Sequence, residues 1–324
     1  MPATVTHTFF AQDVYKKIDK NNIKDYENLK LKYYMFAQGT DPLMFYNILS
    51  INKGKNIRNL QNITHTTKIN ETFETIITYI KQKKYYNDSQ TLLFLYGLIT
   101  HFVLDSMIHP YIFYKGGFFD SKNPKTYKYN CIHNYIETFM DNKMLEKNNY
   151  NSDKFTFKNF CFNLTPFSNS LNDTIYYTYK KVYGVENMDK IYYKSLTSMK
   201  KFLRMFRVDR YGIKKFFYKK IDYFTPKNKF RFECLSYHKI EDKRDYLNLE
   251  KKVWYYPSDK NIKSNLCFYE LYEEAINEAV KIINEINNYL FDDKKINIKN
   301  IFKNKSYLTG IDCTKKNELK YFEF

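Results

Sequence analysis

The chain has 324 residues, 44% of them apolar and 27% charged, which indicates a folded protein of one large domain and excludes a disordered chain. Lys and Arg total 53 against 35 Asp and Glu, and the formal net charge of +18 fits either an anionic partner or a biased composition. Only six of the basic residues are arginine. We therefore favour biased composition over a surface that reads phosphates or bases with rigid guanidinium groups.

Turn-forming residues are scarce, with eight glycines and seven prolines, which favours long helices over many short strands. In the first half of the chain, apolar residues recur at helical spacing, and Asn70 and Asp88 or Ser89 can cap helices. We expect helices over residues 8–20, 25–37, 70–84, 89–110 and 130–147, with a break at 39–42 (GTDP) and a polar loop at 115–128.

The second half continues the helical pattern without a fixed repeat or a linker rich in proline or glycine. We expect helices over residues 170–182, 190–206, 211–223 and 264–290, with a polar stretch at 224–262 that contains Trp254. The sequence thus predicts one all-α domain over residues 1–324, a multi-helix bundle. Its metal-ligand half is residues 1–145, and its C-terminal helical half is residues 146–324.

Three observations predict a cytoplasmic protein. No apolar run reaches the roughly 18–20 residues of a membrane-spanning helix. The opening residues 1–18 lack the basic segment and apolar core of a secretory signal. Five scattered cysteines form no CxxC pair, which predicts reduced thiols.

Residues 97–110, GLITHFVLDSMIHP, place His101, Asp105 and His109 at every fourth position of an apolar helix. A buried Asp is rare unless it is paired or holds a metal. Side chains four apart lie about 40° apart around a helix and about 6 Å along it, so two of them can converge on one zinc ion. His101 and His109 are about 12 Å apart along the axis, so the stripe predicts two metals with Asp105 between them.

The next predicted helix repeats this spacing with His133 and Glu137, which would complete the second metal site. A lone buried histidine is usually a core residue, and one HxxxD pair arises often by chance. Five of the six histidines, however, fall within residues 7–133. This joint pattern favours a multi-zinc cluster, in which neighbouring metals can bind a phosphoryl group.

Four motifs then resemble those of the zinc-dependent phospholipase C family: THTFF (6–10), GTDPLMFY (39–46), HFVLDSMIHPYI (101–112) and HNYIE (133–137). LNLEKKVWYYP (247–257) and SNLCFYELYEEAINEA (264–279) are similar to the C-terminal part of its non-secreted bacterial branch. The segment from about 145 to 235 carries no recognisable motif. The resemblance implies an all-helical fold shared with single-strand-specific zinc nucleases, and a trinuclear zinc site.

The resemblance also implies a ligand set. One zinc would be held by Asp41, His65, His101 and Asp105. A second would be held by His109, His133 and Glu137. His7, with Asp105 bridging, would form part of a third site, and Asp41 would serve either as a ligand or as the general base.

Two departures from the family pattern limit what the resemblance implies. Secreted members bind the third zinc with an N-terminal Trp, whereas this chain begins Met1-Pro2 and His7 follows soon after. We therefore expect two zinc ions and leave the third open. An aromatic residue follows the Asp in the choline-binding enzymes, whereas Pro42 follows Asp41 here, so choline specificity is not implied.

These inferences predict a zinc-dependent phosphodiester hydrolase that cleaves a phospholipid headgroup in the manner of phospholipase C. The positive charge would favour contact with an anionic membrane surface, and Phe45 or Tyr46 could face a lipid or a base, although core packing is the simpler role. One alternative is a nuclease or nucleotide phosphatase on the same metal site. Another is a non-catalytic metal-binding protein, since a cytoplasmic phospholipase would endanger its host. The oligomeric state is not predicted.

Overall fold

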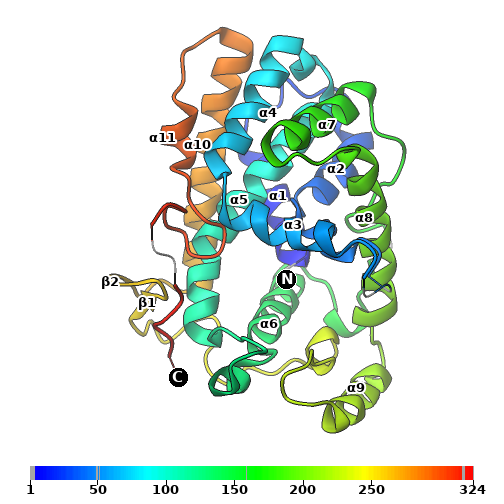
Figure 1. Cartoon of the computed structure of the whole chain (residues 1–324), viewed down its shortest axis with the longest axis vertical. Coiled ribbons are helices and arrows are strands. Elements are labelled where there is room, and N and C mark those ends of the chain that lie inside the picture. Colours follow the sequence, from blue (N-terminus) through cyan, green and yellow to red (C-terminus); the bar gives the residue numbers. More distant parts are fainter. Residues whose placement is uncertain (1–3, 49, 51, 158, 316–317, 324) are drawn as a thin grey trace.

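The computed structural model describes residues 4–48, 50, 52–157, 159–315 and 318–323. Within them, helices dominate and the one sheet has two short strands, so the prediction of an all-α fold is confirmed (Figure 1). The first six helices are α1 (Thr4–Lys17), α2 (Tyr26–Phe36), α3 (Lys55–Thr66), α4 (Ile69–Lys83), α5 (Ser89–Gly116) and α6 (Ile132–Lys147). The others are α7 (Asn169–Tyr183), α8 (Met188–Phe202), α9 (Ile213–Phe224), α10 (Phe268–Asp292) and α11 (Ile298–Phe302).

Four elements of the structure were not predicted, two helices and two strands. The helices α3 and α11 were not predicted, because the sequence of α3 is polar on average and α11 has only five residues. The polar stretch after residue 224 contains β1 (Trp254–Tyr256), which pairs antiparallel with β2 (Asp259–Ser264). In β1, Trp254 is buried and its indole N–H donates to the Leu266 carbonyl at 3.1 Å, so this hairpin is tied to the start of α10.

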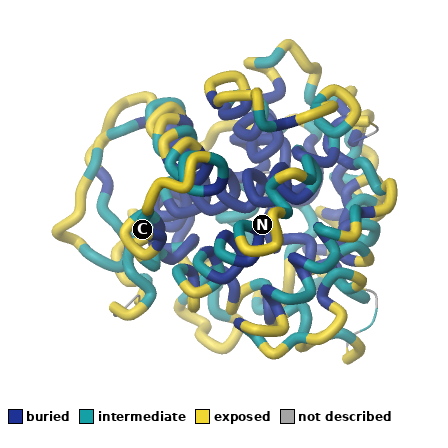
Figure 2. Tube along the Cα trace, turned by 90° about the horizontal axis from the view of Figure 1, so that it is seen from above, coloured by how far each residue is buried: buried dark blue, intermediate teal, exposed yellow. Residues whose placement is uncertain are grey.

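The helix α5 is the centre of the molecule, and α1, α2, α6 and α10 pack around it. Figure 2 shows buried residues along the middle of the trace and exposed residues at its rim. No unbroken apolar run of the sequence is long enough to span a membrane, but α5 as a whole is long and apolar enough to cross one by length and composition. However, 94% of its most apolar window is buried inside the protein, which is what a core helix requires.

The helix α5 continues past Pro110 to Gly116, rather than ending at the proline as expected. A proline inside a helix cannot donate to the carbonyl four residues earlier, here that of Ser106. The backbone of Gly310, at φ +66°, lies so close to this carbonyl that a Cβ there would be 2.4 Å from the Ser106 oxygen. The C-terminal segment therefore packs on the point where the proline interrupts the hydrogen bonds of α5.

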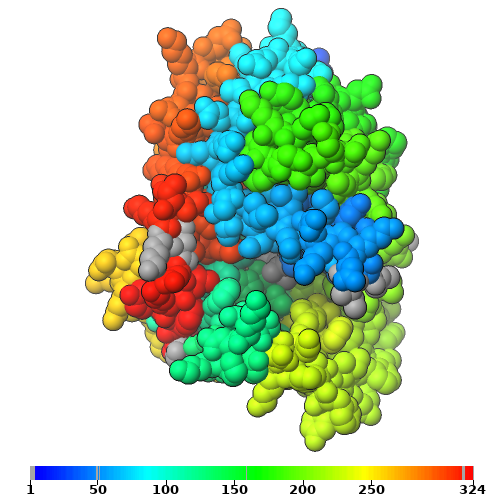
Figure 3. Space-filling view, viewed as in Figure 1, coloured from blue at the N-terminus to red at the C-terminus, as the bar shows by residue number. Residues whose placement is uncertain are grey.

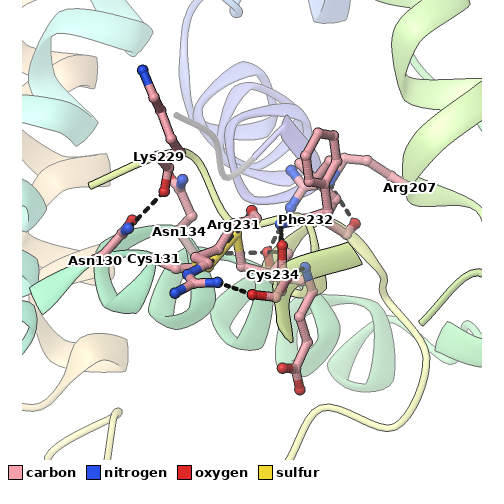
Figure 4. Close-up of a disulfide and its surroundings, with 12 residues drawn as sticks. Asn130, Cys131, Asn134, Arg207, Lys229, Arg231, Phe232 and Cys234 are labelled. Carbon is pink, nitrogen blue, oxygen red and sulfur yellow. Dashed lines mark hydrogen bonds between the residues drawn. A yellow bond between two sulfur atoms is a disulfide. The ribbon is translucent and has the colours of Figure 1, made fainter. Parts of the chain in front are cut away.

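The expectation of five reduced cysteines is wrong for Cys131 and Cys234, which form a disulfide (Figure 4). Their Cα atoms are 6.2 Å apart, although 103 positions separate them in the sequence. The fold brings the two cysteines together, and no local spacing in the sequence indicates the pair. Cys161, Cys267 and Cys313 are free.

Candidate metal centre

The helix α5 carries the central stripe of the site. His101, Asp105 and His109 are all buried, and the Asp105 Oδ2 atom lies 3.4 Å from His101 Nε2 and 3.7 Å from His109 Nδ1. The carboxylate thus stands between the two imidazoles, as the spacing predicts. Because the helix is fixed by the core on all sides, this stripe is a rigid base for the other elements.

A first group adds residues from two short segments. Asp41 begins the 3₁₀ helix η1 (Asp41–Phe45), and His65 is in the last turn of α3. His65 Nε2 is 3.2 Å from Asp41 Oδ1 and 3.2 Å from His101 Nε2. The possible ligand atoms of Asp41, His65 and His101 all lie within 4.8 Å of one another, close enough to share one ion.

A second group lies at the other end of the stripe. His133 and Glu137 are one turn apart on α6, and the Glu137 Oε1 atom is 3.2 Å from His133 Nε2 and 3.3 Å from His109 Nε2. The ligand atoms of these three residues again lie within 4.8 Å. The His133 side chain is 20% exposed, whereas that of Glu137 is buried, so this group is open to solvent on the His133 side.

A third group joins His7 of α1 to Asp105 and His101, with His7 Nε2 at 3.1 Å from Asp105 Oδ1. The buried Asp141 of α6 holds the start of α1, because its carboxylate accepts hydrogen bonds from the backbone N–H groups of Val5 and Thr6. Whether the N-terminus completes this third site was left open, and residues 1–3 lie outside the described residues.

The donor set fits zinc. Among the described residues, the Asp105 Oδ2 atom faces the cluster and is buried without a hydrogen bond, whereas in His7, His101 and His133 the unbonded ring nitrogen is Nδ1 and the nitrogen at the cluster is Nε2. Such orphaned polar atoms are costly unless another partner completes them. A cavity of about 20 Å³ lies between Asp105, His7, His109 and Glu137, large enough for about one water-sized species.

The hydrogen bonds of two imidazoles prepare them as ligands. His65 Nδ1 donates to the Gln61 carbonyl at 2.8 Å, and His109 Nδ1 donates to the Tyr307 carbonyl at 3.0 Å. Each bond leaves Nε2 as the ring nitrogen that faces the cluster. Metal-binding histidines are commonly held in this way.

The charges of the cluster compensate one another in the protein without metal. Burial would raise the pKa of Asp41, but the nearby imidazoles of His101 and His65 lower it to about 2. Burial would lower the pKa of His65, but Asp105 and Asp41 raise it to about 9. Burial lowers the pKa of His101 to about 4. At neutral pH, His65 is therefore protonated, and its positive charge lies next to the carboxylates of Asp41 and Asp105.

Three supporting residues were not predicted. Gly39, at φ +54°, packs directly on His101, since a Cβ there would be 2.1 Å from the ring atom Cδ2. Gln61 donates to Asp41 Oδ1 at 2.9 Å. The ring of Tyr307, from the C-terminal segment, lies 4.6 Å from that of His65. The glycine in GTDP could have indicated a close approach of the backbone to another group. The contact between Tyr307 and His65 joins residues about 240 positions apart, and such a contact leaves no pattern in the sequence.

A surface pocket of about 540 Å³ opens beside the second group, and His133 is part of its wall. Its lining comes from the end of α5, the loop before α6 and the segment 228–230, and includes Phe113, Tyr129, Lys229 and Phe230. The pocket therefore connects solvent with the His133 side of the cluster.

The fold and the cluster define an all-helical protein with a buried histidine and carboxylate centre suited to zinc. The model of the zinc dependent phospholipase C family matches residues 6–187, a range that contains all eight residues of the cluster. The chain belongs to this family, and the resemblance inferred from its motifs is confirmed. No curated protein and no solved structure shows a significant match. Zinc is thus supported as the metal, and the role of each of the eight residues as a ligand stays a prediction.

Proposed function

We propose that the protein is a zinc-dependent phosphodiester hydrolase that cleaves a phospholipid headgroup. The observation that carries the proposal is that three ligand groups meet along the buried helix α5, and that a pocket reaches His133, the most exposed of their histidines. A purely structural zinc site is closed by protein ligands, whereas a catalytic site keeps access for water and substrate. Family membership supports the same chemistry.

Zinc, when bound, lowers the pKa of a coordinated water to about 7 and draws negative charge from phosphoryl oxygens. The residues of the chain supply the rest. Asp41 is ionised and held by Gln61 and His65, so its carboxylate can accept the proton of an attacking water or orient it. Asp105 and Glu137 provide the negative charge that binds cations between the groups.

The pocket favours an anionic or neutral headgroup. Among the described residues, its wall contains Lys229 and three asparagines but neither Asp nor Glu. The charge of Lys229 would attract an anionic headgroup and repel a quaternary ammonium group, and Pro42 stands where choline-binding members have an aromatic residue. We expect phosphatidylglycerol or phosphatidylinositol to be cleaved in preference to phosphatidylcholine.

The test is a substrate panel offered to the zinc-loaded protein: these phospholipids, a single-stranded oligonucleotide, a nucleotide and a chromogenic phosphodiester. Release of a phosphorylated headgroup and diacylglycerol is the expected result, and Asp41→Asn should reduce it by about 100-fold or more. Cleavage of the oligonucleotide or nucleotide alone would establish the alternative activity on the same site. Turnover of none of them would contradict the proposal and favour a metal-binding protein.

Two further expectations are part of this proposal. We keep residues 1–324 as one domain, because one continuous hydrophobic core includes residues from Val5 to Tyr307. We also keep the cytoplasmic location as a prediction. The disulfide is the observation that weighs against it, since reducing compartments rarely preserve one.

A further inference from the structure

The helix α9 presents its apolar residues to solvent rather than to the core. At about 100° per residue, six of its side chains fall within an arc of about 160°. All six are exposed: Ile213, Phe216, Phe217, Ile221, Tyr223 and Phe224. Tyr223 and Phe224 are 84% and 83% exposed, and each ring has the other as its neighbour, at 5.1 Å between centroids. Folded proteins seldom leave such a patch uncovered unless it has a partner.

The opposite side of α9 attaches it to the body by polar contacts. The Tyr218 hydroxyl donates to the Phe206 carbonyl at 2.9 Å, and the buried Asp222 accepts the backbone N–H groups of Phe232 and Glu233 at 2.9 and 2.8 Å. Arg231 adds bonds to the carbonyls of Asp222 and Thr225. The helix is therefore fixed with its apolar arc outward, which is the reverse of an ordinary surface helix.

Basic residues outnumber acidic ones along the segment that contains this arc. Residues 210–230 contain seven Lys or Arg and a single acidic residue, Asp222, which is buried and bonded. Lys220 stands in the middle of the arc, with its Nζ atom 4.4 Å from the ring centroid of Phe216. A second copy of the chain docked on this face would bring the same positive charges together, whereas an anionic surface would neutralise them.

We propose that the exposed face of α9 is a docking surface for an anionic lipid bilayer. Aromatic rings beside lysines are the combination that inserts at the boundary between headgroups and acyl chains. Each basic side chain near an anionic leaflet strengthens binding about fivefold. The aromatic residues and the lysines of this face are thus suited to the same partner.

The position of α9 relates this surface to the metal centre. The chain leaves α9 and, within six residues, forms the segment 228–230 that lines the pocket beside His133. The exposed Phe230 and Phe118 lie on that pocket as well. Figure 3 shows the α9 region, in yellow-green, projecting at the lower end of this face of the molecule. A bilayer held there would present headgroups at the entrance, so the surface serves the proposed function, although binding itself does not depend on turnover.

The test is cosedimentation of the full-length protein with vesicles of phosphatidylglycerol and phosphatidylcholine at equal amounts, and with vesicles of phosphatidylcholine alone. We expect binding to the anionic vesicles that weakens as salt is raised. Tyr223→Ser with Phe224→Ser should weaken it at least about tenfold, and Lys220→Gln with Lys227→Gln about fivefold for each lysine. These side chains are exposed, and circular dichroism checks that each variant is folded.

The matched controls are Leu249→Ser and Lys295→Gln, which alter exposed apolar and basic residues elsewhere and should bind as the wild type does. Absence of wild-type binding, or an equal loss in the controls, would overturn the proposal. So would a wild-type dimer that Tyr223→Ser with Phe224→Ser converts to a monomer without any change in vesicle binding, since the face would then be an interface between copies.

Discussion

At the scale of single residues, the cluster depends on how closely the GTDP turn approaches the ring of His101. Gly39 adopts φ +54° with its Cα hydrogens against the imidazole, and a methyl group there would lie 2.7 Å from Nε2, the ring nitrogen that faces Asp41 and His65. The ring must move to relieve such a contact. The position of this nitrogen is therefore set by a residue that is not itself a ligand.

We predict that Gly39→Ala lowers zinc affinity by about 10–100-fold, the range seen when the support of a ligand is altered. The measurement is a zinc titration against a competing chelator. Gly184→Ala is a matched control, because Gly184 has φ +68° but a Cβ there would meet nothing within 4 Å. Both variants carry the same backbone strain, so equal affinities in the two would contradict a role for the contact with His101.

Zinc binding should also release a proton from His65. With a pKa of about 9, its imidazole is protonated at pH 7 without metal and must lose that proton to become a ligand. His101, with a pKa of about 4, has no proton to lose. Zinc affinity should therefore rise with pH up to about 9. Calorimetry at pH 7 in buffers of different ionisation enthalpy counts the protons.

The control for this count is His65→Asn, which has no proton to release at this position. We expect it to release about one proton fewer than the wild type. The same number from both proteins would show that His65 is neutral before zinc arrives, or that it does not bind the metal.

At the scale of elements, the sequence was most informative where one helix carries its own pattern. The stripe on α5 and the pair on α6 could be placed from spacing alone, because side chains four apart share a face of a helix. The structure brings all eight predicted residues into three groups, which periodicity could not have done for His7, Asp41 and His65. His7 and Asp41 were placed by the motifs that resemble the family, and His65 by the ligand set that this resemblance implies.

Other elements were harder to recognise. The helix α3 is amphipathic, but its sequence is polar on average, so it was not predicted, and in the structure it packs against η1. The C-terminal segment reaches the site through contacts of Tyr307 with His65 and His109, across about 200 positions or more. The disulfide joins positions 103 apart. Contacts of this kind are fixed by the whole fold, and a single sequence does not reveal them.

The disulfide connects the start of α6 to the segment that follows α9, next to the pocket (Figure 4). We predict that Cys131→Ser with Cys234→Ser lowers the free energy of unfolding by roughly 2–5 kcal/mol, because the cross-link closes a long loop. Urea unfolding with and without a reducing agent measures this. Cys313→Ser removes a free thiol and is the control. If the reducing agent leaves the wild-type midpoint unchanged, the disulfide does not stabilise the fold.

At the scale of the whole molecule, two features are compatible with a membrane. The net positive charge fits contact with an anionic membrane surface, and the length and composition of α5 fit a membrane-spanning helix. Burial assigns α5 to the core, so its composition reflects packing around the cluster. The overall charge of +18 was explained by composition, yet the exposed aromatic residues and lysines of α9 form a local surface that composition does not explain. The distribution of residues over the folded surface, rather than their total, therefore identifies the proposed membrane contact.

The central claim is that helices α1, α5 and α6, with η1 and α3, assemble a zinc cluster. Elemental analysis of the purified protein tests it most directly, with His101→Ala and His133→Ala beside the wild type. We predict at least two zinc ions per chain, with a loss of about one or more in each variant, because the two histidines belong to different groups. Fewer than one zinc per chain, unchanged by either substitution, would contradict the account.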